Sequence, residues 1–515
     1  MNLVVLFVLF SVLTFSSPIC AQPDAATAKQ KFATGQYDAA LLDFLKLLEN
    51  NPQDAELNLL AGRCYLDGGW EKCKALPMLE LVVKQPVFDK SAWYYLGRAQ
   101  AYCGKHSEAI DSYQKLLSQS PLPPVLTKED IEQRIRWSNN AMDLMKKPVK
   151  VSFENLGPAI NSPFADYSPF VSHHEDFLVF NSRRPDQAVL KPNGDYTSNV
   201  YISKEKDGKW QKAENIGDVI NTDGEEEVVG LCADGNPILY RFENAKSQGD
   251  IFTGPIFENQ FLEPYKLNMN INSPATENGA SISPDGKVLY FASNRAGGLG
   301  GFDIYRTQSL PNGEWGEPYN LGPNVNTAAD EDFPTISFDG KVLYFSSKGH
   351  NSMGEFDIFK TQMMEDNVNF GPAANLGYPV NSSSDDKNLC MNERGRYGYL
   401  STIKKDTQGD LDIYRVTFKD VESELTIVKG VVKAANASLN VPPVTIEVID
   451  GKTNDTYGQY KSNPLSGKYV MILPPGNYYL QIETPGFISY SENISILDKN
   501  SYVPVLDKDI ILKAK

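Results

Sequence analysis

The chain is poor in the residue types that most often carry catalysis and metal binding. Its 515 residues include only 4 histidines and 6 cysteines. No His-Glu-x-x-His or Cys-x-x-Cys pair occurs, so the common zinc motifs are missing. A Gly-x-Ser-x-Gly nucleophile elbow and a phosphate-binding P-loop are missing too. We therefore expect a protein that is not an enzyme and that needs no metal or other cofactor.

The chain also lacks a surplus of basic residues. It has 49 Lys and Arg against 65 Asp and Glu, a formal net charge of −16, which argues against nucleic acid or an anionic membrane as the main partner. With 41% hydrophobic and 22% charged residues, the composition excludes a disordered tail, a coiled coil and a collagen-like rod. At about 100–200 residues per domain, the length predicts roughly three domains.

Long hydrophobic runs are confined to the N-terminus. Residues 1–15, MNLVVLFVLFSVLTF, are followed by SSPICAQ, which predicts a signal peptide over 1–21 and a mature chain that begins at Gln22. The run is shorter than the roughly 20 residues of a membrane span, although an uncleaved anchor is the alternative. Lipidation of Cys20 is a second alternative, disfavoured because Ile19 is not the small residue that lipoprotein signals have there. We expect an exported chain without a transmembrane span, in a compartment where disulfides form.

A helical repeat is predicted over residues 22–147. The stretches GQYDAALLDFLKLLENNP (35–52) and GKHSEAIDSYQKLLSQSP (104–121) match at an offset of two units of about 34 residues. A looser copy lies between them, at 61–86. Small residues that let helices approach, aromatic residues that fill the gap and a proline at the end of each unit resemble tetratricopeptide repeats, whose concave surfaces bind protein partners.

Two local features follow from this arrangement. The segment after the last repeat predicts a closing helix with Thr127 as N-cap and Asp130 at the capping-box position. Antiparallel packing of the repeat helices would bring Cys73 and Cys103 together near one end, where a disulfide is possible. The alternative is three buried free thiols, Cys64 among them.

Residues 148–419 change to short alternating strands, and a second repeat appears there. Its first landmark is a Leu or Ile followed four residues later by Ile or Val and then Asn. The copies start 51 to 60 residues apart, slightly longer than a typical propeller blade of about 40–50 residues. The asparagines of the five copies are Asn161, Asn221, Asn272, Asn326 and Asn381.

Three further landmarks predict four strands per copy. An Asp-Gly turn leads into an apolar strand, most clearly in SPDGKVLYFAS (283–293) and SFDGKVLYFSS (337–347). An Asp-Ile-aromatic triplet predicts the third strand. An aromatic residue six positions before the next leucine landmark marks the fourth, at Trp210, Phe261, Trp315 and Phe370. Four strands per copy predict a β-propeller.

The number of blades depends on the ends of this region. The fifth copy stops after its third strand, and residues 149–157 match a fourth strand placed before any complete blade. Pairing of the two ends would close a five-bladed ring without a free sheet edge; six blades with one degenerate unit is the alternative. The stretch SPDGKVLYFASNRAGGLGGFDIY (283–305) resembles the WD40-like propeller repeat of bacterial envelope proteins.

The last part of the chain, 424–515, predicts a small β-sandwich. Alternating strands such as VTIEVID, KYVMILP and YYLQIET are separated by turns such as Pro-Pro-Gly. The segment SNPLSGKYVMILPPGNYYLQIETPGF (462–487) resembles a carboxypeptidase regulatory-like domain, which implies a structural or adhesive role.

Two sets of carboxylates recur within the propeller repeat. Asp250, Asp303, Asp357 and Asp412 begin the third strands, and we interpret them as structural turn carboxylates that accept backbone hydrogen bonds; a ring of free carboxylates is the alternative. A second set follows the asparagine landmark and is expected around one mouth of the central channel, where it could attract a cation or a basic partner. A solvated rim without a ligand is the alternative. This acidic rim comprises Asp166, Glu225, Glu226, Glu227, Glu277, Asp330, Glu331, Asp332, Asp385 and Asp386.

The order of signal peptide, helical repeats, propeller and sandwich resembles the PorE-type envelope proteins of Bacteroidota. That family is associated with type IX secretion and gliding motility, and an OmpA-like peptidoglycan-binding domain usually follows its sandwich. No such domain is found before Lys515, so we expect no direct peptidoglycan binding. The resemblance implies a periplasmic, outer-membrane-associated scaffold that binds protein partners. A carbohydrate-binding or glycan-processing propeller is the alternative.

Overall fold

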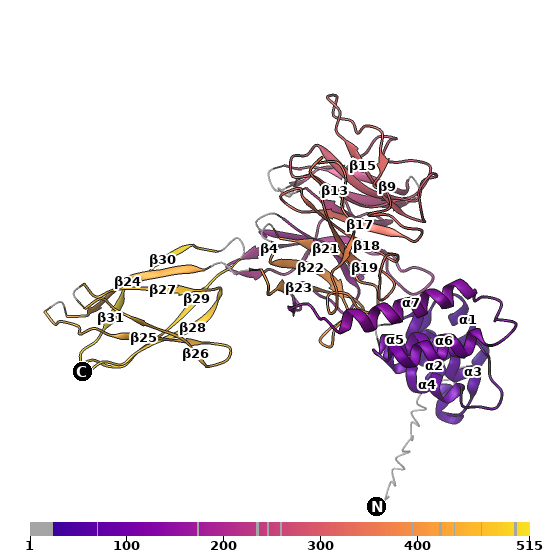
Figure 1. Cartoon of the computed structure of the whole chain (residues 1–515), viewed down its shortest axis with the longest axis horizontal. Coiled ribbons are helices and arrows are strands. Elements are labelled where there is room, and N and C mark those ends of the chain that lie inside the picture. The colour runs from indigo at the N-terminus through magenta and orange to yellow at the C-terminus, as the bar shows by residue number, and fades with distance from the viewer. Residues whose placement is uncertain are drawn as a thin grey trace, which may run out of the picture. The chain divides into compact units, whose positions relative to one another are not determined.

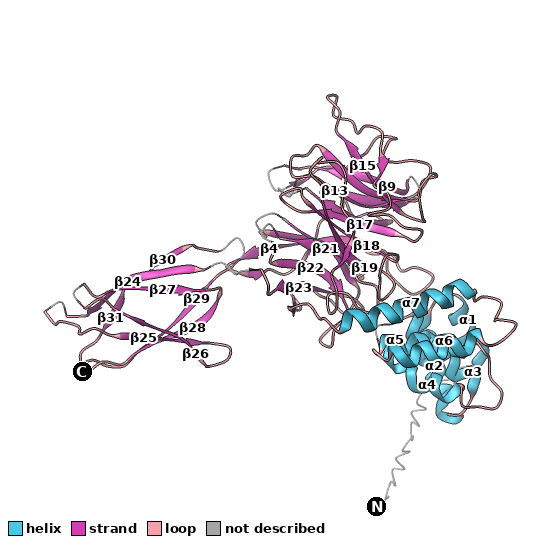
Figure 2. Cartoon of the chain, in the orientation of Figure 1, coloured by secondary structure: helices cyan, strands magenta, loops and turns pink. Residues whose placement is uncertain are grey.

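The computed structural model describes most of the chain after its N-terminal segment (Figure 1). The predicted signal peptide and Cys20 lie outside the described residues. The chain divides into two compact units between Cys103 and Gly104, and each is considered by itself. Helices occupy the N-terminal part and strands the rest (Figure 2). The described residues are 24–69, 71–172, 175–232, 236–244, 247–257, 260–392, 395–421, 425–436, 438–464, 466–498 and 502–515.

The first unit is built from antiparallel helix pairs. Its elements are α1 (Ala25–Ala33), α2 (Tyr37–Asn50), α3 (Ala55–Asp67), η1 (Lys72–Lys74), α4 (Ala75–Val82) and α5 (Ala92–Tyr102). The side chains of Asp24 and Asp54 cap the N-termini of α1 and α3. Gly62 allows α3 and α4 to approach closely, because a Cβ atom there would lie 3.0 Å from the Cγ of Leu79.

A disulfide joins two elements of this unit. Cys73 lies in η1 and Cys103 ends α5, and the structure links them with a Cα–Cα distance of 5.5 Å. Cys64 is a buried free thiol in the core between α1, α2 and α3. Within the described residues, no helix combines the length and the apolar stretch that a membrane crossing requires.

Two further helices, α6 (His106–Leu117) and α7 (Lys128–Met145), belong to the second unit. Thr127 caps α7 as expected, and its hydroxyl oxygen accepts the Asp130 N–H. α7 also contacts the propeller directly. The indole N–H of Trp137 donates to the Lys348 carbonyl at 3.3 Å, and the Asn140 amide donates to the Ser352 carbonyl at 2.8 Å.

Five antiparallel sheets, the blades, follow one another along the chain. The first contains β2 (Asp166–Val171), β3 (Phe177–Ser182), β4 (Asn199–Lys206), β5 (Lys209–Trp210) and β6 (Glu214–Asn215). The second contains β7 (Glu225–Leu231), β8 (Ile238–Asn244), β9 (Ser247–Gly254) and β12 (Tyr265–Lys266), with β10 (Ile256–Phe257) and β11 (Gln260–Phe261) as a separate hairpin. The third contains β13 (Glu277–Ile282), β14 (Val288–Ser293), β15 (Asp303–Gln308) and β16 (Tyr319–Asn320).

The last two blades have the same antiparallel order. The fourth contains β17 (Glu331–Ile336), β18 (Val342–Ser347), β19 (Asp357–Gln362) and β20 (Ala374–Asn375). The fifth contains β21 (Lys387–Met391), β22 (Tyr397–Thr402), β23 (Asp412–Phe418) and β1 (Val151–Asn155). Each blade contacts the next, and the fifth contacts the first, so the fold is a closed five-bladed propeller.

The ring closes through the strand that enters it. β1 pairs antiparallel with β23, in a register that runs from Val151 opposite Phe418 to Asn155 opposite Tyr414. Val151 and Phe153 pack against the core of the fifth blade. The predicted closure and the count of five blades are therefore confirmed, and the six-bladed alternative is wrong.

The fourth strands lie later than the sequence indicates. In the first four blades each is only two residues long and starts four residues after the aromatic landmark, as at β6 and β16. The aromatic residue lies in the preceding hairpin, and in two copies it packs against a tyrosine of another blade. Trp210 contacts Tyr399 and Phe370 contacts Tyr290, with ring centroids 6.0 and 5.8 Å apart. These residues are conspicuous in sequence because they fill the seams between blades.

The C-terminal region is a two-layered β-sandwich. One sheet contains β27 (Lys468–Leu473), β24 (Thr426–Ala434), β30 (Val505–Asp507) and β31 (Ile510–Leu512), the last two parallel to β24. The other contains β26 (Thr456–Lys461), β25 (Thr445–Asp450), β28 (Gly476–Ile482) and β29 (Tyr490–Ile496). Strict alternation of buried and exposed residues along β27 turns Tyr469, Met471 and Leu473 into the core.

Candidate functional site

The aspartates of the third-strand landmark fix the turns that precede the strands. Asp303, Asp357 and Asp412 are fully buried, and each carboxylate accepts hydrogen bonds from the backbone N–H groups three and four residues before it. Burial raises the pKa of Asp357 well above its usual value. Asp250 instead pairs with Lys266 at 2.7 Å. The buried three are committed to local structure, which leaves them no free oxygen for a ligand ring.

The asparagine landmark ties the loop after the fourth strand to the third strand. In every copy the asparagine side chain bonds both backbone groups of a single residue of the third strand. Its amide N–H donates to the carbonyl of that residue, and its amide oxygen accepts from the N–H of the same residue. The landmark therefore satisfies two buried backbone groups with one side chain. The pairs are Asn161 with Ile413, Asn221 with Val200, Asn272 with Ile251, Asn326 with Ile304, and Asn381 with Ile358.

Six of the ten predicted rim carboxylates are buried instead of exposed; one of them, Asp332, is 4% exposed and is described with its partner below. In each blade, one carboxylate at or next to the start of the inner strand accepts hydrogen bonds from both the N–H and the hydroxyl of a Ser or Thr four residues earlier. These bonds turn the carboxylate inward and close the loop between blades. The prediction of an accessible rim is therefore wrong for Asp166, Glu226, Glu277, Glu331 and Asp386, all 0% exposed.

Electrostatics at these carboxylates agrees with a structural role. Burial raises the pKa of all five, and for Asp386 to about 6. Cations oppose this effect in part: the Arg184 guanidinium lies 2.6 Å from Asp166, and the Arg295 guanidinium lies 3.2 Å from Glu277. A raised pKa can mark a general acid, but none of the five lines either of the propeller cavities described below.

The other five rim residues each have a polar or basic partner. The partners are Lys191 for Glu225, Arg241 for Glu227, Lys348 for Asp330, Lys387 for Asp385 and Asn278 for Asp332. The mouth of the channel is thus a set of ion pairs and hydrogen bonds with little acidic surplus. In the described part of the chain, no three or more His, Cys, Asp and Glu side chains are grouped to hold a metal ion.

The central channel is narrow and apolar where the inner strands end. Every blade contributes to the wall of a cavity of about 20 Å³, which is about the space of one water molecule. A ligand larger than that does not fit at this level. The lining includes Val171, Leu231, Ile282, Ile336 and Met391.

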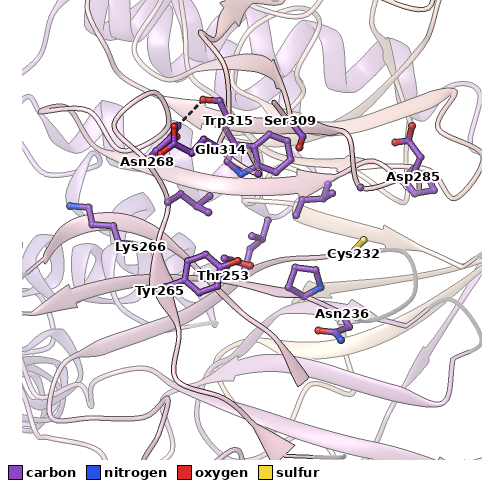
Figure 3. A pocket seen from close by; sticks show the side chains of 17 residues that line it. Cys232, Asn236, Thr253, Tyr265, Lys266, Asn268, Asp285, Ser309, Glu314 and Trp315 are labelled. Carbon is purple, nitrogen blue, oxygen red and sulfur yellow. Dashed lines mark hydrogen bonds between the residues drawn. The ribbon is translucent and has the colours of Figure 1, made fainter. Parts of the chain in front are cut away.

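A larger groove lies between the second and third blades (Figure 3). Its volume is about 680 Å³. Tyr265 and Thr253 of the second blade lie on one side, and Trp315 and Glu314 of the third blade lie on the other. Thr253 is 4% exposed, and its hydroxyl has no hydrogen-bond partner among the described residues. Room for a ligand and an unsatisfied buried polar atom make this groove the candidate binding site of the propeller.

The first unit offers a second candidate surface, on α1, α3 and α5. Lys29 and Glu56 form an ion pair of 2.6 Å between α1 and α3, and Arg98 and Asp67 form one of 2.7 Å between α5 and α3. The guanidinium carbon of Arg63 lies 4.6 and 4.7 Å from the centres of aromatic rings on α1 and α5. This charged face suits a polar partner.

The comparison with protein families identifies the helical repeats. Residues 26–69, which contain α1, α2 and α3, match the tetratricopeptide repeat family. Such repeats are protein-interaction modules, so the match supports a role in binding proteins. No curated protein matches the chain.

The solved structures to which this chain is similar are distant. TolB from Acinetobacter baumannii is 14% identical, with 57% of this chain and 71% of that chain covered and a TM-score of 0.32. The Bacteroides ovatus protein xyloglucan PUL GH43B is 13% identical, with 65% and 78% covered and a TM-score of 0.27. The RRP9 WD40 repeats are 8% identical, with 52% and 100% covered and a TM-score of 0.27. These values carry no inference about activity.

Sequence reasoning missed the inter-blade groove. The landmarks were selected because they recur, whereas the groove lies where the second blade departs from the residues of the third and fifth blades. The signal is present in the aligned second strands, where CADGNPILYRF (232–242) places Leu239 at the position of Tyr290. A comparison of the copies for positions at which one copy differs would have indicated the groove.

Proposed function

We propose that this protein is a non-catalytic scaffold of the cell envelope whose helical repeats and propeller each bind a protein partner. The assembly we favour is one associated with the outer membrane, such as type IX secretion or gliding motility. The carrying observation is the tetratricopeptide match over 26–69 together with the charged face of α1, α3 and α5. A periplasmic location is part of the proposal and is supported by the N-terminal hydrophobic run.

A non-catalytic role is supported by the way the carboxylates are used. Those that recur in the blades accept hydrogen bonds from their own loops or pair with neighbouring cations. A general base needs a free oxygen within reach of a substrate proton. These carboxylates are better suited to holding a rigid platform.

The proposal is tested by capture of partners from native envelopes. We expect crosslinking, affinity purification and mass spectrometry of the mature chain to recover a reproducible envelope protein. The variant Glu56→Arg reverses an exposed charge, since the Glu56 side chain is 66% exposed. We expect it to lower capture about fivefold, because a repulsive charge at the edge of an interface slows association.

The matched control makes the same charge change on another helix. Glu49 is exposed near the end of α2 and forms no ion pair with any described residue, so Glu49→Arg should leave capture within twofold of the unmodified chain. Absence of any reproducible partner would contradict the scaffold. Equal loss with both variants would contradict the assignment of the binding face.

A further inference from the structure

The groove between the second and third blades exists because two large side chains are replaced there by small ones. In the third and fifth blades a tyrosine on the second strand lies opposite an arginine on the third strand. At the same register the second blade has a leucine and a threonine. The pairs are Tyr290 with Arg306, Tyr399 with Arg415, and Leu239 with Thr253.

The third blade shows what the larger side chain does. Arg306 is 3% exposed and fills the seam toward the fourth blade. Its guanidinium donates to the Tyr319 hydroxyl at 2.6 Å and to the carbonyls of Val368 and Asn367 at 3.1 and 3.3 Å. A single arginine therefore joins the fourth strand of its own blade to a hairpin of the next blade.

The second and third blades have counterparts of the groups that surround Arg306, but among the described residues no arginine lies between those groups. Tyr265 lies opposite Thr253 just as Tyr319 lies opposite Arg306. The hairpin that ends in Trp315 corresponds to the one that ends in Phe370, since each closes on an isolated bridge. Tyr265 is 62% exposed, and Gly313 and Trp315 line the groove. The aromatic wall, the hydroxyl and the hairpin backbone are in place around an open volume.

We propose that this groove receives an arginine side chain from a protein partner. A guanidinium is a planar fork of donors that can bond the Tyr265 hydroxyl, the Thr253 hydroxyl and the hairpin backbone together. Its flat face can lie against the Trp315 ring. The rim supplies the matching charge through Asp285 and Glu314. The inference rests on the proposed protein-binding function and adds the chemistry of one partner.

Charge at the groove favours a cation over a neutral ligand. Lys266 also lines it, but its ammonium is paired with the Asp250 carboxylate at 2.7 Å. The carboxylates of Asp285 and Glu314 have no basic partner among the described ion pairs. A lysine would bring charge without the planar fork that the Arg306 site uses, so arginine should be preferred over lysine.

The test uses the full mature chain and a fluorescein-labelled pentapeptide, Gly-Ser-Arg-Ser-Gly, followed by fluorescence anisotropy. Matched peptides carry lysine or citrulline in place of arginine. We expect the arginine peptide to bind at least tenfold more tightly than either, because citrulline keeps the shape without the charge. Equal binding of the three peptides would overturn the proposal.

Variants of the chain locate the site. Thr253→Arg should fill the groove as Arg306 fills its seam, and should weaken peptide binding at least tenfold. Tyr265→Phe removes one exposed hydroxyl, is not expected to disturb folding, and should weaken binding about threefold to tenfold. The control Lys360→Arg places an arginine at the equivalent position of the fourth blade, where the side chain is exposed, and should leave binding unchanged.

Other outcomes separate the groove from the scaffold. Unchanged arginine binding in both Thr253→Arg and Tyr265→Phe would overturn the assignment of the groove. Tighter binding of cellotetraose or chitotetraose than of the arginine peptide, lost in Thr253→Arg, would make the groove a saccharide site and overturn it as well. If no peptide binds while Glu56→Arg still lowers partner capture, the groove inference falls and the proposed function stands.

Discussion

At the scale of single residues, recurrence in this chain marks structure. The asparagines and carboxylates that repeat from blade to blade satisfy buried backbone groups, which would otherwise cost about 1–3 kcal/mol each. The residues with room for a ligand lie where the repeat is broken, at Leu239 and Thr253. In a propeller with internal repeats, deviations are therefore better guides to binding sites than the shared motif.

Asp332 provides a test of the buried charge at the channel mouth. It is 4% exposed, and burial raises its pKa from 3.8 to about 6. The folded state therefore binds the proton more tightly than the unfolded state, so the contribution of Asp332 to stability is greatest below pH 4 and falls as pH rises from about 4 to 6. A shift of this size corresponds to about 3 kcal/mol.

We expect Asp332→Asn to make stability fall less steeply between pH 4 and 6 and to raise the free energy of unfolding above pH 6 by about 2 kcal/mol. Urea unfolding at a series of pH values, followed by tryptophan and tyrosine fluorescence, measures it. The control Asp218→Asn removes an exposed carboxylate and should change stability by about 0.5 kcal/mol or less. A variant that keeps the slope of the unmodified chain between pH 4 and 6 would contradict the assignment.

At the scale of elements, periodicity predicted which segments pair, and packing decided where they end. The Asp-Gly turns gave β14 and β18 correctly, because Gly286 and Gly340 have the positive φ that such turns need. The fourth strands were placed too early because the aromatic residues pack in the seams. The burial of the rim carboxylates was not predictable from the sequence either. The alternation of apolar and polar residues cannot reveal that a Ser or Thr four residues away turns Glu331 inward.

The disulfide between η1 and α5 is the covalent link within the first unit. Cys73 and Cys103 are 30 residues apart in sequence, and a closed loop of that length should stabilise the folded state by about 3–4 kcal/mol through the entropy of the unfolded chain. We expect the double variant Cys73→Ser, Cys103→Ser to have a lower melting temperature of its helices, measured by circular dichroism at 222 nm. Dithiothreitol should lower the same transition in the unmodified chain and leave the double variant unaffected. Equal sensitivity of both proteins to the reductant would contradict the link.

At the scale of the whole molecule, closure of the propeller depends on one short strand, β1, which precedes the first blade in sequence and completes the fifth. β1 covers the edge of β23, and Asn161 then ties the next loop to Ile413 of that same strand. Because α7 ends at Met145 and β1 begins at Val151, the closing strand follows directly from the helix that also contacts the fourth blade. Ring closure and attachment of α7 are therefore made by one continuous segment.

Because β1 covers the edge of β23, we predict that loosening β1 changes the association state of the protein. Phe153 packs against the fifth-blade core, and the Lys404 ammonium lies 4.3 Å from the centre of its ring. Phe153→Ala should lower the free energy of unfolding by about 2 kcal/mol, less than the full cost at a completely buried site. A loosened β1 would expose the edge of β23, and free edges pair with other chains, so light scattering after size exclusion should detect oligomers near the unfolding midpoint. Ser152→Ala, on the exposed face of the same strand, should keep the association state of the unmodified chain and a stability within about 0.5 kcal/mol of it. Oligomers that formed equally in both variants would mean that β1 does not protect this edge.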